Sequence, residues 1–202
     1  MLFDFRTLSA NQRYHLITQT LTPRPIAWIL TRNVTGSFNL APFSYFTALC
    51  SDPALLVVSI GDKADKIGKD TKENLKREQE CVLHIPSMGS AMAVNASAAS
   101  LPYEESELNI CGLDLSPFSA NLPRISEAKV AMHCKLYDSH TLGESSFTAC
   151  YLEVINVYID DTIVSKEGKH TYISSDGLQP LGRLGGNDFA QYGGKLTIKR
   201  PA

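Results

Sequence analysis

Two strand-like segments in the middle of the chain limit its fold more than any other feature. They run from Lys129 to His140 and from Phe147 to Ile159, and Leu142-Gly143-Glu144 joins them. A connection this short allows two strands to pair only in the antiparallel sense. We therefore expect a long β-hairpin at the centre of the fold.

Further strand candidates surround this hairpin, and helix candidates are few and short. The apolar run from Ala54 to Ile60 has the character of a buried strand. Proline residues punctuate loops at positions 102, 117 and 123. Strands without regular βαβ alternation indicate a mainly β fold, an antiparallel barrel with a few short helices, and argue against a doubly wound nucleotide fold. The additional strands are expected at Cys81 to Ile85 and Lys195 to Lys199, and the short helices at Ser90 to Ala99 and near Glu104 to Asn109.

A second hairpin is predicted near the N-terminus, from Ile26 to Leu30 and from Phe38 to Ala41, with a turn at 33–36. Pro42 lacks a backbone donor, so regular pairing is expected to break there. The next residues, Phe43, Ser44, Tyr45 and Phe46, combine flat apolar surface with a hydroxyl group. That mixture suits an aromatic ring edged with heteroatoms, although core packing beside a stiff turn would use the same residues.

A helix is predicted from Thr71 to Glu80, with Asp70 as its cap and Glu73 three residues later. The free N–H groups at its start, the Thr71 hydroxyl and the Lys69 ammonium group could together bind a phosphate. A capped surface helix with solvated lysines is the structural alternative. The strand before it would bring Ser59-Ile60-Gly61 to the same neighbourhood, and no complete P-loop or Gly-x-Gly-x-x-Gly pattern is present.

Composition fits one soluble domain over residues 1–202. The chain is 44% hydrophobic and 20% charged, with a net charge of -2. Neither nucleic acid nor a membrane is expected as a partner, because acidic residues interleave with the basic ones, as between Asp62 and Glu80. No secretory signal or membrane-crossing run is apparent, and Ser9 to Gln12 fits a capping box that opens a helix.

Cysteine and histidine residues do not form a recognisable reactive or metal-binding pattern. The five cysteines are odd in number and widely spaced, which favours buried free thiols and a reducing cytoplasm. His133 and His140 share one predicted strand, but seven residues of spacing put them on opposite faces. We expect no metal site, and no Gly-x-Ser-x-Gly sequence suggests a hydrolase.

Several separated motifs resemble those of the flavin reductase-like domain family, in the same order along the chain. They are Arg24-Pro25-Ile26-Ala27-Trp28, Asn39-Leu40-Ala41-Pro42-Phe43-Ser44, Ser51-Asp52-Pro53, Lys69-Asp70-Thr71 with Asn74, the helix containing Asn95, and Leu181-Gly182-Arg183-Leu184-Gly185-Gly186. That family includes flavoredoxins and reductase components of two-component monooxygenases. The resemblance implies a split β-barrel, non-covalent FMN, and a homodimer whose subunits both help to build each flavin site.

The resemblance also implies which residues bind the cofactor. Lys69 and Thr71 would hold the phosphate, and Trp28 would flank the ring. Three positions depart from the usual family residues, namely Thr47, His84 and Phe189, which bears on substrate contacts rather than on flavin binding. The complete expected set is Arg24, Trp28, Asn39, Ala41, Pro42, Phe43, Ser44, Ser59, Ile60, Gly61, Lys69, Thr71, Asn74 and Arg183.

The expected activity is that of an oxidoreductase in which NADH or NADPH gives a hydride to bound FMN. A second flavin, oxygen, a metal complex or a partner such as a monooxygenase would then take the electrons. Because the flavin carries this chemistry, no side chain is assigned a catalytic role. The alternatives are a flavoredoxin-like electron carrier that binds no nicotinamide, a flavin-binding sensor, and a related split barrel for heme or a pyridoxal derivative.

Overall fold

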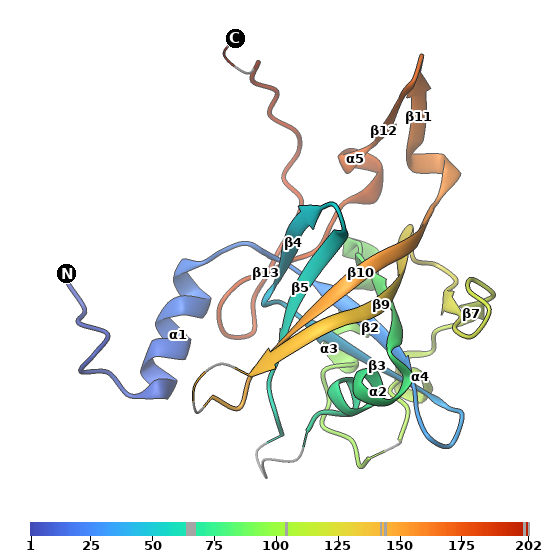
Figure 1. The fold of residues 1–202 in the computed structure, drawn as a ribbon. Helices are drawn as coiled ribbons and strands as arrows, with labels where there is room; N and C mark the ends of the chain where they lie inside the picture. The colour runs from blue at the N-terminus through green and yellow to red at the C-terminus, as the bar shows by residue number, and fades with distance from the viewer. Residues whose placement is uncertain (64–67, 104, 142, 144, 200, 202) are drawn as a thin grey trace.

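The computed structural model describes residues 1–63, 68–103, 105–141, 143, 145–199 and 201. Within them, seven strands form an antiparallel sheet in the order β3-β2-β6-β9-β10-β5-β4, which curves into the barrel-like body of Figure 1. This confirms the expected antiparallel barrel. The strands are β2 (Ala27–Arg32), β3 (Phe38–Phe43), β4 (Phe46–Ser51), β5 (Ala54–Ile60), β6 (Glu80–His84), β9 (Val130–Thr141) and β10 (Thr148–Ile159).

The predicted hairpins are both present. Strands β9 and β10 pair from Thr141 and Thr148 to Val130 and Ile159, with two register shifts along the way. Residues 142 and 144 of the predicted connection lie outside the described residues. Strands β2 and β3 form the other hairpin, and Pro42 pairs with Trp28 inside it. The expected break at Pro42 is therefore wrong, because β3 lies at an edge of the sheet, where a missing N–H costs no ladder bond.

Short elements lie outside the seven-stranded sheet. Strand β1 (Arg24–Pro25) pairs with β13 (Gly182–Arg183), which also pairs with β14 (Phe189–Ala190). The hairpin of β11 (Val164–Glu167) and β12 (His170–Ile173) projects from the body (Figure 1). The other short elements are η1 (Met88–Ser90), α3 (Ala91–Ala96), α4 (Leu108–Cys111), β7 (Leu115–Ser116), β8 (Arg124–Ile125), η2 (Asp161–Ile163) and α5 (Ser175–Leu178).

The two longer helices differ in how their N-termini are capped. Helix α1 (Ala10–Thr20) has the expected capping box, in which Ser9 and Gln12 each bond the other's backbone N–H. Helix α2 (Asp70–Glu78) starts one residue earlier than expected, and Lys69 occupies the cap position. Asp70 is thus the first helical residue rather than the cap, and it makes no capping bond. Glu80, predicted to end this helix, belongs to β6.

Two other local predictions need correction. No strand forms at Lys195 to Lys199 in the described residues, because this segment has no partner strand to supply ladder bonds. The helix expected from Ser90 to Ala99 is shorter, and a 3-10 turn precedes it. The helix expected near Glu104 to Asn109 forms later in the chain, as α4.

No helix among the described residues is both long and apolar enough to span a membrane.

Strand β2 runs through the interior and has a hydrophobic cluster on each face. Trp28 and Leu30 pack on one side with Leu122 and Ile125. On the other side, Ala27 and Ile29 pack with a second cluster that includes Leu83 and Val58. The Trp28 indole N–H donates to Ser97 Oγ at 2.9 Å, so this tryptophan is buried with its polar atom satisfied.

His84 is a fully buried polar residue beside the first of these clusters. Its Nε2 accepts the backbone N–H of Ile125 at 3.0 Å, so Nδ1 carries the proton and donates to the Trp28 carbonyl, also at 3.0 Å. Burial lowers the pKa of His84 from 6.5 to about 4. A protonated Nε2 could not accept the Ile125 N–H, so the neutral ring is part of the packing.

We expect the fold to weaken in mild acid because of His84. Between about pH 6.5 and pH 4 the unfolded state binds a proton at this ring and the folded state does not, so folding stability is lost as the pH falls. A shift of this size corresponds to about 3 kcal/mol. Urea unfolding at pH 7.5 and pH 4.5 measures the loss, and His84→Gln should reduce this pH dependence. An unchanged pH dependence in that variant would assign the acid sensitivity to other groups.

Candidate functional site

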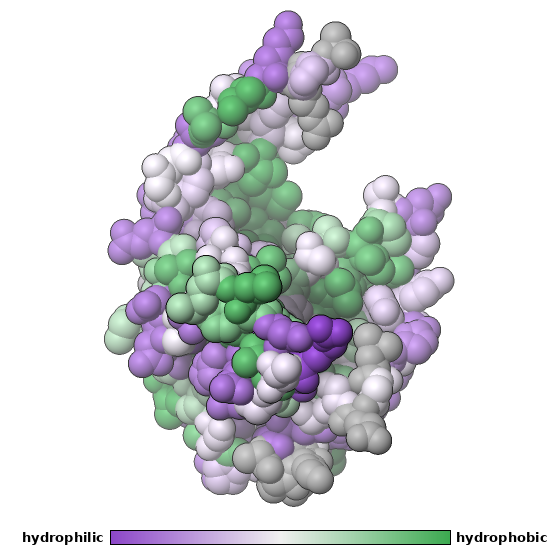
Figure 2. Space-filling view, turned by 90° about the vertical axis from the view of Figure 1, so that its left-hand side faces the viewer, coloured by the Kyte–Doolittle hydropathy of each residue, from purple (hydrophilic) through white to green (hydrophobic). Residues whose placement is uncertain are grey.

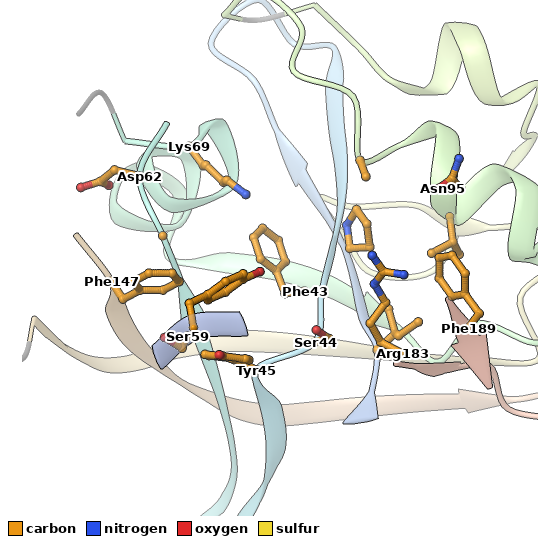
Figure 3. Close-up of a pocket in the computed structure, with 16 residues that line it drawn as sticks. Phe43, Ser44, Tyr45, Ser59, Asp62, Lys69, Asn95, Phe147, Arg183 and Phe189 are labelled. Carbon is orange, nitrogen blue, oxygen red and sulfur yellow. The ribbon is translucent and has the colours of Figure 1, made fainter. Parts of the chain in front are cut away.

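A cavity of about 330 Å³ opens beside the turn between β3 and β4. Its volume lies in the range of small-molecule sites, about 300–1,000 Å³. Figure 3 shows Phe43 at the end of β3 and Ser44 and Tyr45 on this turn, facing Arg183 and Phe189 across the cavity and Asn95 of α3 beyond them. Ser59 of β5, which lies beside Tyr45 and Phe147 in Figure 3, and Gly61 just after this strand also line the cavity. The site therefore combines flat apolar faces with a few polar groups.

A second cavity of about 90 Å³ adjoins the first. Pro42, Lys69 and Ala98 line both, so the two form one elongated site with a wide and a narrow part. The narrow part lies at the start of α2, where helix N–H groups point away from the helix and its dipole is positive. This arrangement fits a ligand with a broad ring system at one end and an anionic group at the other.

Lys69 lies where the two cavities meet. Its ammonium group is 5.5 Å from the centre of the Phe43 ring. The surrounding protein atoms lower the pKa of Lys69, and the positive charge of Lys63 lowers it further. Lys69 is nevertheless exposed, because its side chain faces the open site, so an incoming anion can reach it.

The narrow cavity also holds carboxylates. Asp70 Oδ1 lies 2.7 Å from Lys63 Nζ, in an ion pair rather than a hydrogen bond of standard geometry. Glu107 is buried and accepts the Leu40 N–H at 2.9 Å. Burial raises the pKa of Glu107, and the charge of Asp70 raises it further. Each carboxylate is therefore engaged by a protein group, which leaves Lys69 and the helix start facing the cavity.

A buried hydrogen-bond network positions Thr71. Asn39 Nδ2 donates to Thr71 Oγ1 at 2.8 Å, and Asn74 Nδ2 donates to Thr31 and Asn33 at 3.0 and 2.8 Å. Because Thr71 Oγ1 accepts from Asn39, its own hydroxyl proton remains for a ligand in the narrow cavity. Asn39 and Thr71 line that cavity, and Asn74 is fully buried behind them.

The structure brings most of the predicted site residues together. The wide part is lined by Pro42, Phe43, Ser44, Ser59, Gly61, Lys69 and Arg183, and the narrow part by Asn39, Ala41, Pro42, Lys69 and Thr71. Trp28, Ile60 and Asn74 line neither cavity, since all three are 0% exposed. These three residues lie behind the lining, and Ile26 and Ser59, their neighbours in sequence, line the wall near Trp28 and Ile60.

Arg24 lies behind the site rather than in its lining. Its guanidinium donates to the carbonyls of Thr18, Leu21 and Leu184 at 2.6, 2.7 and 2.9 Å, and its Nε donates to Ser44 Oγ at 3.3 Å. One buried cation thus joins the C-terminal end of α1 to the segment after β13. It also orients Ser44, whose hydroxyl proton stays available to the cavity.

Sequence reasoning missed several lining residues that come from distant segments. Tyr14, Asp62, Asn95 and Phe147 border the wide part, and Lys63 and Glu107 border the narrow part. Asn95 lies in one of the motifs that carry the family resemblance, which is a usable signal, whereas Tyr14 and Phe147 carry none. The three positions that depart from the usual family residues lie apart: Phe189 lines the cavity, Thr47 is exposed on β4, and His84 is in the core.

Cysteine and histidine residues take no part in the lining. Cys81, Cys134 and Cys150 are buried free thiols, as expected, whereas Cys111 is half-buried and Cys50 is exposed on β4, which corrects its prediction. No group of three or more potential metal ligands occurs among the described residues. His133 pairs with Glu80 at 2.9 Å, and His140 is exposed.

Fold and site together define a split-barrel protein with a cofactor-sized cavity at the barrel rim. Residues 19–175 match the model of the flavin reductase like domain. The match covers more than half of the chain, and the chain therefore belongs to this family of flavin-related oxidoreductases.

Similar proteins support this placement along the whole length. YwrF of Bacillus subtilis is 34% identical over 206 residues, covering 100% of this chain and 99% of its own. Nitrilotriacetate monooxygenase component B of Bacillus cereus is 28% identical, covers 98% of both chains and superposes with a TM-score of 0.89. The 2-nitrobenzoate 2-nitroreductase NbaA of Pseudomonas fluorescens is 27% identical with a TM-score of 0.88, covering 100% of this chain and 96% of its own.

Proposed function

We propose that the protein binds FMN non-covalently, with the ring in the wide cavity and the phosphate in the narrow one. The observation that carries this proposal is the junction of the two cavities at Pro42, Lys69 and Ala98, next to the start of α2. The flat faces of Phe43 and Pro42 suit a ring, and Lys69, Thr71 and the helix start suit a phosphate. The residues present therefore fit the cofactor.

We further propose an NADH- or NADPH-dependent oxidoreductase that passes electrons on to a flavin, oxygen, a metal complex or a partner protein. Bound FMN supplies hydride and electron transfer. The chain's residues hold the ring, and Arg183 brings a positive charge to the wide cavity, where it would stabilise negative charge on a reduced ring. Similarity to a monooxygenase component B supports a partner enzyme as one acceptor.

Arg183 is held in place for this role. Its guanidinium donates to the carbonyls of Asp188 and Gly186 and lies 4.6 Å from the centre of the Phe189 ring. These contacts leave the cation beside the cavity without a carboxylate partner among the described residues. An unpaired guanidinium attracts anionic groups, either of the cofactor or of a nicotinamide nucleotide.

A homodimer that shares its flavin sites is part of the proposal. Figure 2 shows hydrophobic and hydrophilic side chains interspersed on one face, around a hollow. Large apolar side chains are exposed on the sheet, among them Leu49 on β4 and Ile155 and Val157 on β10. Such a surface supports burial against a second copy. Light scattering after size-exclusion chromatography tests this, and a monomer at micromolar concentration would contradict it.

Anaerobic reduction tests the proposed activity. FMN-loaded protein should lose its oxidised-flavin absorbance when NADH or NADPH is added, because the open site lets a nicotinamide reach the ring. Dithionite is the control for a reducible flavin. Bleaching by dithionite alone would favour a flavoredoxin-like carrier, and failure to retain FMN at all would reject the flavin assignment.

A further inference from the structure

Three aromatic rings gather on one wall of the wide cavity, and the proposed function gives them no role. They are Tyr14 of α1, Tyr45 of the turn between β3 and β4, and Phe147 just before β10. The Tyr45 ring lies 6.3 Å from that of Tyr14 and 6.2 Å from that of Phe147. The interplanar angle between Tyr45 and Phe147 is 25°, so these two rings are stacked. We call this group the aromatic wall.

The aromatic wall is not part of the hydrophobic core. Tyr14 is 47% exposed and Phe147 is 38% exposed, whereas Phe43 in the same cavity is 6% exposed. A single exposed ring is ordinary, but adjacent exposed rings at a cavity are typical of a ligand site. Their flat faces gain most from another planar ring, through offset or edge contacts.

The chain supports this wall locally. A Cβ atom on Gly61 would lie 3.0 Å from the Phe147 ring, so the glycine lets this ring lie directly over the backbone. Arg24 bonds the last carbonyls of α1 and so fixes the helix that carries Tyr14. Figure 3 shows Tyr45 and Phe147 on the opposite side of the cavity from Arg183 and Phe189.

We propose that the aromatic wall binds a planar aromatic ring of the second substrate, the molecule that exchanges electrons with the cofactor. None of its three residues lines the narrow cavity, where the phosphate would lie. In the wide cavity we place the cofactor ring along Pro42 and Phe43 and the second ring against the wall. The inference rests on the proposed function. The ring belongs either to a nicotinamide donor or to an aromatic acceptor, two sources that share one recognition chemistry.

Two carboxylates of similar size test the aromatic preference. FMN-loaded protein is titrated with benzoate and with cyclohexanecarboxylate by isothermal titration calorimetry. We expect benzoate to bind more tightly, and Tyr14→Leu to weaken benzoate about three- to tenfold while cyclohexanecarboxylate changes little. Tyr172→Leu is the matched control, because Tyr172 is 48% exposed on β12 and does not line the cavity.

Steady-state kinetics then separate the two sources. A higher KM for NADH or NADPH in Tyr14→Leu assigns the wall to the donor. A higher KM for 2-nitrobenzoate, the aromatic compound named for the similar nitroreductase NbaA, assigns it to an aromatic acceptor. Equal affinity for the two carboxylates, an equal decrease in Tyr172→Leu, or unchanged KM values would overturn the inference. The FMN dissociation constant is measured in the wild-type protein and in every variant. Failure of the wild-type protein to bind FMN would refute the proposed function, whereas weaker FMN binding in Tyr14→Leu alone would place the wall against the cofactor and overturn this inference.

Discussion

Replacing Lys69 and Thr71 together by alanine should weaken FMN binding by about 1–3 kcal/mol for each charge-assisted hydrogen bond to the phosphate that the change removes. Lys69 contributes its ammonium group where the cavities meet, and Thr71 contributes a hydroxyl group that accepts from Asn39 and can donate its proton to a phosphate. For the pair, the dissociation constant should rise by roughly thirtyfold or more. Quenching of FMN fluorescence on binding measures it.

Riboflavin, which lacks the phosphate, makes this test specific. The wild-type protein should prefer FMN to riboflavin, and the double variant should lose that preference while its affinity for riboflavin is retained. Lys76→Ala is the control, because Lys76 lies on the same helix but is exposed and pairs with Glu73. An unchanged preference for FMN in the double variant would place the phosphate elsewhere.

Replacing Arg24 by methionine should destabilise the fold by about 4 kcal/mol. The change leaves three backbone carbonyls without their charged donor, in a region where Arg24 is 5% exposed. It also removes the positive charge from the C-terminal end of α1, where the helix dipole is negative. Urea unfolding monitored by circular dichroism measures the difference.

Two further arginine variants complete this experiment. Arg24→Lys should recover only part of the stability, because one ammonium group cannot reach acceptors arranged around a planar guanidinium. Arg6→Met is the control, since Arg6 pairs with Asp4 at the surface and should contribute little. Equal stability of the Arg24→Met and wild-type proteins would mean that water replaces the guanidinium donors at no cost.

The strand pattern is predictable from the sequence because local alternation and turn residues encode it. The central hairpin, β2 with β3, and β5 all form close to their expected bounds. The strand expected at Lys195 to Lys199 does not, because an extended segment becomes a strand only beside a partner, and no local pattern reports a partner. For the same reason, local sequence patterns do not predict the pairing of β1 with β13, which lie more than 150 residues apart in the chain.

The site is predictable where one segment supplies it and not where distant segments meet. Lys69, Thr71 and the turn around Phe43 lie in short motifs, and all line the cavities. Trp28, expected beside the ring, is not in the lining, because both faces of β2 are buried and alternation alone cannot say which face borders a cavity. Tyr14 and Phe147 reach the cavity through the packing of α1 and the β10 end, which only the folded chain specifies.

The pairing of β1 with β13 has a consequence for biosynthesis. The cavity wall includes Tyr14 in an early segment of the chain and Phe189 in a late one. The whole segment from residue 14 to residue 189 must therefore leave the ribosome before the wall is complete. A nascent chain could form the early β2–β3 hairpin long before it could hold a flavin. Cofactor capture is therefore expected after translation of this region ends, as a late step in maturation.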